Sequence, residues 1–117
     1  MTRNILCVDD DESVRKLLTD ILIAKGHAVS VATNGKEAID LVTVTQFDAI
    51  ITDHQMPEIT GLELVRYLRA AAYAGKIFIF SGALSTPLRK EYEALKVDAI
   101  AAKPTGVSEI LALFQMP

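Results

Sequence analysis

The sequence contains no tryptophan, one cysteine and no long apolar run. A single cysteine excludes an intramolecular disulfide, and the position of Cys7 between Leu6 and Val8 favours a buried, apolar role. No stretch reaches the roughly 18 to 20 apolar residues that a membrane helix requires. The first residues lead directly into a strand-like segment instead of a signal peptide. We therefore expect a cytoplasmic protein without a membrane partner.

No segment of the chain is rich in basic residues. The 12 Lys and Arg are outnumbered by 15 Asp and Glu, and no basic block of the kind that binds nucleic-acid phosphates is present. Direct nucleic-acid binding is therefore not expected. Linker-like stretches rich in Pro, Gly and Ser are missing as well, so we expect one domain, residues 1–117. We expect this domain to be a monomer or a weak homodimer.

The sequence does contain a regular alternation of strand-like and helix-like segments. Residues 5–8, 49–52 and 77–80 are apolar without polar alternation, which is typical of strands covered on both faces. The strand-like segments at residues 29–31 and 98–102 are weaker and are expected at the sheet edges. With right-handed crossovers, this pattern predicts an α/β fold: a doubly wound, five-stranded parallel sheet of order 2-1-3-4-5, flavodoxin-like.

Residues of special conformation predict where the helices begin and end. Gly26 and Gly75 are expected to stop the first and third helices. Thr86 followed by Pro87 predicts the N-cap and first residue of the fourth helix. Four side chains of that helix and its end are expected to be exposed: Arg89, Lys90, Tyr92 and Lys96.

Polar side chains follow four of the five strand-like segments. Asp9 and Asp10 follow the first, Asp53 the third, Ser81 the fourth and Lys103 the fifth. In a sheet of order 2-1-3-4-5, ligands bind beyond the carboxyl ends of the strands, where the chain reverses direction. We therefore expect these side chains to form one site.

The composition of this expected site favours a divalent cation and a phosphoryl group. Three neighbouring carboxylates repel one another unless a cation relieves them, and oxygen ligands favour Mg²⁺, with Mn²⁺ as the alternative. An ammonium group and a hydroxyl are suited to phosphoryl oxygens, so Lys103 and Ser81 are expected to bind them while one carboxylate is the nucleophile. His54 neighbours Asp53, but adjacent side chains near a strand end point apart, so no role is expected for it.

The chain resembles the receiver domains of bacterial two-component response regulators over its whole length. The matching stretches are residues 5–12, 32–38, 47–61, 80–82 and 102–104. The resemblance implies that Asp53 accepts a phosphoryl group from a phosphohistidine of a sensor histidine kinase or phosphotransfer protein. It also implies a Mg²⁺ site made by Asp10, by Asp9 through water, by Asp53 and by the backbone carbonyl of Gln55.

The same resemblance implies a mechanism and an output. Ser81 and Lys103 would bind the phosphoryl oxygens, and the domain would phosphorylate and dephosphorylate its own aspartate instead of turning over a separate substrate. The surface made by the fourth helix, fifth strand and fifth helix would then change for partner docking or phosphorelay. The Lys103–Pro104 bond would be cis. One departure concerns the switch pair, because Ile100 stands where the family usually has Tyr or Phe to work with Ser81.

Two alternatives remain open at the level of sequence. Asp9, Asp10 and Asp11 also resemble the nucleophile motif of haloacid-dehalogenase-like phosphatases, although that interpretation leaves Asp53 without a role. The second alternative is a degenerate receiver that acts only as an interaction module, which Ile100 favours.

Overall fold

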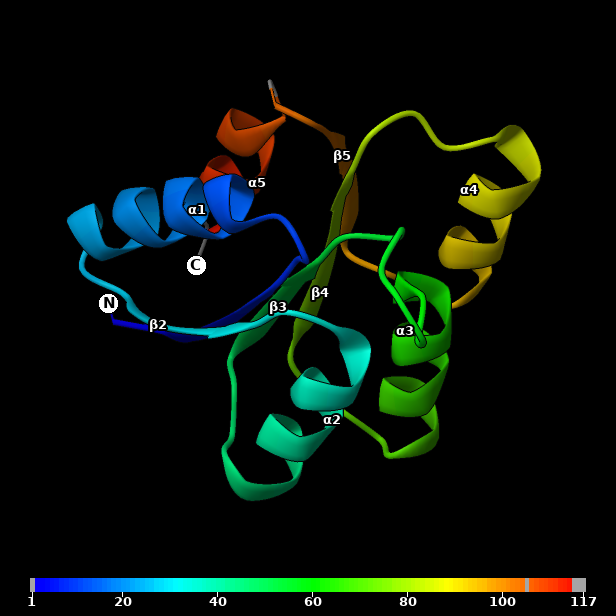
Figure 1. Cartoon of the computed structure of the whole chain (residues 1–117), viewed down its shortest axis with the longest axis horizontal. Helices are drawn as coiled ribbons and strands as arrows, with labels where there is room; N and C mark the ends of the chain where they lie inside the picture. The colour runs from blue at the N-terminus through cyan, green and yellow to red at the C-terminus, as the bar shows by residue number, and fades with distance from the viewer. Residues whose placement is uncertain (1, 105, 115–117) are drawn as a thin grey trace.

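The computed structural model of the chain describes residues 2–104 and 106–114, so the end positions of the predicted domain, 1–117, lie outside the described residues. Strands and helices alternate along the chain (Figure 1). The strands are β1 (Asn4–Val8), β2 (Ala28–Ala32), β3 (Ala49–Thr52), β4 (Lys76–Ser81) and β5 (Ala99–Ala102). The helices are α1 (Glu12–Ala24), α2 (Gly35–Val44), α3 (Gly61–Ala70), α4 (Thr86–Ala94) and α5 (Val107–Phe114).

The five strands form one parallel sheet in the order β2-β1-β3-β4-β5, which confirms the predicted topology. The burial of the strands follows their sequences. All of β3 and nearly all of β1 and β4 are buried, whereas the edge strands β2 and β5 are half-exposed over most of their length. A central strand needs apolar side chains on both faces, and an edge strand does not.

Helices cover both faces of the sheet (Figure 1). Alternate residues of β1 point to opposite sides: Ile5 and Cys7 join the core beneath α1 and α5, and Leu6 and Val8 join the core beneath α2, α3 and α4. Cys7 is fully buried, as its apolar neighbours predict. In the described part of the chain, no helix is both long and apolar enough to cross a membrane.

The ends of two helices differ from the sequence predictions. Ser85 caps α4 instead of Thr86, because its hydroxyl accepts a hydrogen bond from the Leu88 N–H and Thr86 is already helical. Helix α3 ends at Ala70, before Gly75, because Ala72 adopts the left-handed conformation that reverses the chain. At the matching position after α1 this conformation falls on Gly26, as predicted.

Candidate functional site

Backbone pairing brings the predicted site residues to one edge of the sheet. The N–H of Asp53 donates to the carbonyl of Val8 at 2.9 Å, so Asp53 lies beside the end of β1, where Asp9 follows. The N–H of Lys103 donates to the carbonyl of Ser81 at 2.8 Å, which joins the ends of β4 and β5. Parallel strands end at the same edge, so residues distant in sequence become neighbours.

The side chain of Lys103 links two buried carboxylates. Its Nζ lies 2.8 Å from Oδ2 of Asp9 and 3.1 Å from Oδ2 of Asp53. Asp9 is 2% exposed and Asp53 is 6% exposed, so both charges lie in a poorly solvated environment and need this partner. The remaining oxygens accept backbone hydrogen bonds, Oδ1 of Asp9 from the Asp11 N–H and Oδ1 of Asp53 from the His54 N–H.

Three carboxylates converge in a way that suits a hard cation. One oxygen from each of Asp9, Asp10 and Asp53 lies within 4.8 Å of the others. Asp10 is exposed, so the cluster opens to solvent on one side. Three negative charges face one ammonium group here, and a divalent cation would neutralise the difference. The all-oxygen donor set therefore fits Mg²⁺.

Burial and ion pairing shift the pKa values of Asp9 and Lys103. Burial raises the pKa of Asp9 above its usual value, and the hydrogen bonds from Lys103 and from the Asp11 N–H oppose this only in part. For Lys103, burial alone would lower the pKa, but the hydrogen bonds to Asp9 and Asp53 outweigh it and raise the pKa. The ammonium form of Lys103 is therefore held firmly at neutral pH.

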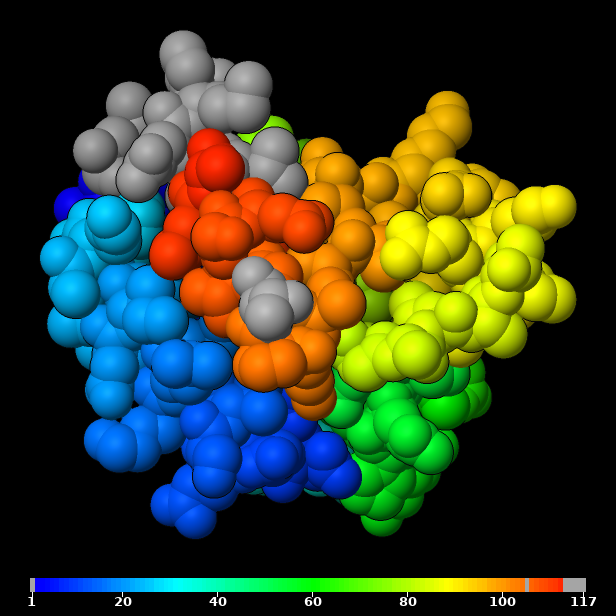
Figure 2. Space-filling model, turned by 90° about the horizontal axis from the view of Figure 1, so that it is seen from above, coloured from blue at the N-terminus to red at the C-terminus, as the bar shows by residue number. Residues whose placement is uncertain are grey.

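A groove of about 500 Å³ opens beside Asp53 and Lys103. Ser81, which is 5% exposed, and the exposed Gln55 both line it. Figure 2 looks onto this end of the molecule, where the segments that follow β1, β3, β4 and β5 border one another in blue, green, yellow-green and orange. The structure thus brings every predicted site residue to this end of the sheet except Ile100.

Ile100 lies within β5, which β4 separates from β3, the strand that precedes Asp53. It pairs in register with Ile79 of β4 and packs, half-buried, against the core beneath α2, α3 and α4. Its side chain has no polar atom, so it can contribute packing but no hydrogen bond to Ser81. The Lys103–Pro104 peptide bond is cis, as the resemblance implied.

The sequence did not predict a contact between His54 and Tyr92. Tyr92, expected on the surface, is fully buried, and its hydroxyl lies 2.6 Å from Nδ1 of His54. Burial raises the pKa of Tyr92, and the charge of Asp53 raises it further, so the hydroxyl stays protonated. The spacing of Leu88, Tyr92 and Leu95 on one helix face was the available signal for its burial.

Comparison of the sequence with known families gives one match over nearly the whole chain. The profile described as the response regulator receiver domain matches residues 5–115. The response regulator MprA of Mycolicibacterium vanbaalenii is 35% identical over 112 residues, 96% of this chain and 48% of that protein. MprA of Mycobacterium tuberculosis is 34% identical over the same share of the chain. The chain spans about half the length of these curated relatives.

Solved structures of response regulators also resemble this chain. The chemotaxis response regulator CheY4 of Vibrio cholerae is 28% identical and superposes with a TM-score of 0.88 over 98% of both chains. The response regulator TrrA of Thermotoga maritima, solved in complex with Mg²⁺ and BeF, is 27% identical, with a TM-score of 0.84 over 97% of this chain and 96% of that one.

Proposed function

The chain belongs to the response regulator receiver domain family of two-component signalling, and from this premise we propose that Asp53 is its phosphoacceptor. The observation that carries the proposal is the bridge from Lys103 Nζ to Asp9 and Asp53, with Asp10 beside them. Receiver domains typically use Mg²⁺, and the acidic cluster fits it. When bound, Mg²⁺ would supply positive charge at the transferring phosphoryl oxygens. Asp9, Asp10, Asp53 and the Gln55 carbonyl would hold it.

Asp53, Lys103 and Ser81 have different roles in the proposed phosphoryl transfer. Oδ2 of Asp53 faces the Lys103 ammonium, so this oxygen is the nucleophile. It attacks phosphorus of a phosphohistidine as the P–N bond breaks, and the electron pair of that bond returns to the imidazole nitrogen. Lys103 and the Ser81 hydroxyl then bind the oxygens of the transferred group. The domain modifies itself and is not a turnover enzyme on a separate substrate.

The partners follow from this chemistry. The donor is a sensor histidine kinase or a phosphotransfer protein, and the phosphorylated domain signals through docking to a target or by relaying the phosphoryl group. Phosphorylation of Asp53 affects β5 through two switch positions. Ser81 acts by a hydrogen bond, and Ile100 acts by packing. A cytoplasmic location, Mn²⁺ as a substitute ion and a monomer or weak homodimer complete the proposal.

The two alternatives are not favoured. A phosphatase of the haloacid-dehalogenase type gives Asp53 no task, yet this carboxylate is buried and paired with Lys103. A degenerate receiver would not need to hold three carboxylates together against their mutual repulsion.

Intact mass spectrometry after incubation with acetyl phosphate and Mg²⁺ tests the assignment. We expect the wild type to gain one phosphate, Asp53→Asn to gain none, and the matched control Asp40→Asn, an exposed aspartate of α2, to behave as wild type. Phosphorylation of Asp53→Asn would contradict the assignment. Steady phosphate release from p-nitrophenyl phosphate by Asp53→Asn would instead favour the phosphatase alternative.

A further inference from the structure

We propose that the hydrogen bond between His54 and Tyr92 couples the charge on Asp53 to the position of α4, so that both are positioning residues for the response to phosphorylation. The inference deepens the proposed function and rests on it. It starts from a continuous set of contacts. The His54 N–H donates to Oδ1 of Asp53 at 2.8 Å, and Nδ1 of the same residue shares a 2.6 Å hydrogen bond with the Tyr92 hydroxyl.

The contact is tightly fitted. The rings of His54 and Tyr92 meet edge to face, with centroids 5.7 Å apart and planes at 88°. A Cβ atom on Gly61 would lie 2.8 Å from the Tyr92 hydroxyl and 2.9 Å from the His54 Cα, and would collide with the Asp53 carbonyl oxygen. Glycine at this position lets the backbone of Asp53 and His54 lie this close to Tyr92. Because these groups are closely packed, a displacement of His54 also displaces Tyr92.

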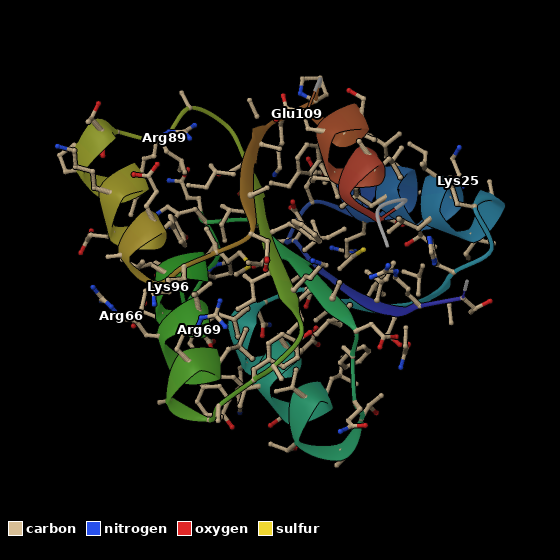
Figure 3. The ribbon with its side chains drawn as sticks, turned by 180° about the vertical axis from the view of Figure 1, so that it is seen from behind. Lys25, Arg66, Arg69, Arg89, Lys96 and Glu109 are labelled. Atoms are coloured by element: carbon tan, nitrogen blue, oxygen red, sulfur yellow. The ribbon has the colours of Figure 1, made fainter. Side chains whose placement is uncertain are left out.

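Helix α4 is held at its C-terminal end by α3. The Arg69 guanidinium donates to the carbonyls of Leu95 and Lys96, each at 2.8 Å. Figure 3 shows Arg69 and Lys96 beside each other where these helices meet, with Arg66 further out. Tyr92 comes one turn before this anchor, and Arg89 and Lys90 in the first half of α4 are exposed. A push or pull at Tyr92 would therefore act on a helix that is anchored by Arg69 at its C-terminal end.

Phosphorylation changes the hydrogen bond at the start of this route. In the free domain, Oδ1 of Asp53 belongs to an anionic carboxylate, and the His54 N–H makes a charge-assisted hydrogen bond to it. Phosphorylation of Oδ2 converts Oδ1 to the carbonyl oxygen of an acyl phosphate, a weaker acceptor. The two states of Asp53 thus interact differently with His54, which is the condition for shifting a conformational equilibrium.

The contact between His54 and Tyr92 provides an aromatic hydroxyl, which Ile100 lacks. Ile100 packs against the same core cluster as Tyr92 but offers no hydroxyl. The aromatic hydroxyl near the acceptor comes instead from α4, and it is fixed by a hydrogen bond in the unphosphorylated state.

The test uses ¹H–¹⁵N NMR spectra of the chain titrated with beryllofluoride and Mg²⁺, which mimic the phosphoryl group. We expect Tyr92→Phe to reduce the shifts of the α4 amides, Thr86–Ala94, to roughly half or less, while the shifts of Ser81 and Lys103 persist. His54→Leu should act in the same way, and His54→Asn, whose amide can replace Nδ1, should restore the response. By reciprocity, Tyr92→Phe should also change the apparent beryllofluoride affinity by about fivefold.

Tyr73→Phe is the matched control. It also removes a tyrosine hydroxyl hydrogen bond, to the Phe47 carbonyl at 2.9 Å, but at the opposite end of the sheet, and we expect an unchanged α4 response. A purely structural role for Tyr92 predicts lower stability with a full α4 response, and that result would overturn the inference. Wild-type spectra without shifts at Ser81 and Lys103 would overturn the proposed function, and this inference with it.

Discussion

Replacing Lys103 with methionine removes one positive charge from between two buried carboxylates while keeping most of the side-chain volume. In the free domain, Nζ of Lys103 lies 2.8 Å from Asp9 and 3.1 Å from Asp53. Without it, these two acids and Asp10 face one another within 4.8 Å without an internal cation. We expect Lys103→Met to lower the free energy of unfolding more than any surface lysine substitution.

The magnitude follows from the geometry. At an effective dielectric of about 20, Coulomb's law gives about 6 kcal/mol for the pair at 2.8 Å and about 5 kcal/mol for the pair at 3.1 Å. Desolvation of the ammonium group offsets much of this attraction, and Lys103 keeps 22% of its side chain exposed. We therefore expect a net loss of about 3 kcal/mol at neutral pH without Mg²⁺.

The deficit should depend on pH with a defined sign. The pKa of Asp9 is raised in the folded state, chiefly by burial, and removing Lys103 raises it further. A carboxyl group with a raised folded pKa disfavours folding above that pKa, and the penalty disappears as pH falls through it toward the unfolded value of 3.8. The deficit of Lys103→Met should therefore be smaller at about pH 5 than at about pH 7.5.

Urea unfolding followed by circular dichroism measures the deficit at both pH values, with and without millimolar Mg²⁺. The proposed Mg²⁺ site exists only in the folded domain, so the ion should recover part of the loss. Lys90→Met, at an exposed position in α4, is the control and should stay within about 0.5 kcal/mol of wild type. A deficit of Lys103→Met below about 1 kcal/mol, or one insensitive to both pH and Mg²⁺, would refute the reasoning.

Further predictions concern glycines, a helix end and the buried thiol. In urea unfolding, Gly61→Ala should lower the free energy of unfolding by about 2 kcal/mol because its Cβ would meet backbone atoms. Gly82→Ala places its Cβ in open space and should leave the free energy of unfolding unchanged. Equal effects of the two substitutions would contradict this. Ala72→Gly should stabilise by about 1 kcal/mol, since this residue has φ 59°, and Gly26→Ala should destabilise similarly; a loss from Ala72→Gly would contradict this. Burial raises the pKa of Cys7 to about 12, so a thiol reagent should react on the order of a thousandfold more slowly with native than with urea-unfolded protein; equal rates would contradict its burial.

Most of the fold was predictable because local sequence and sheet position agree. The apolar runs of β1, β3 and β4 could only be buried on both faces, and the mixed sequences of β2 and β5 suited the edges. Helix ends were less predictable. Ser85 and Thr86 can both cap a helix, and the choice between them depends on how the helix packs on the sheet.

The sequence by itself determined the sheet order and the residues at the carboxyl ends of its strands, because parallel strands of known order have ends at one edge. It therefore places Asp9, Asp10, Asp53, Ser81 and Lys103 at one edge of the sheet. The contact between His54 and Tyr92 was decided only by the tertiary structure. These residues lie 38 positions apart in the sequence. Their contact depends on how closely α4 approaches the loop that carries Asp53 and His54, which the packing of α3 and the room left by Gly61 control.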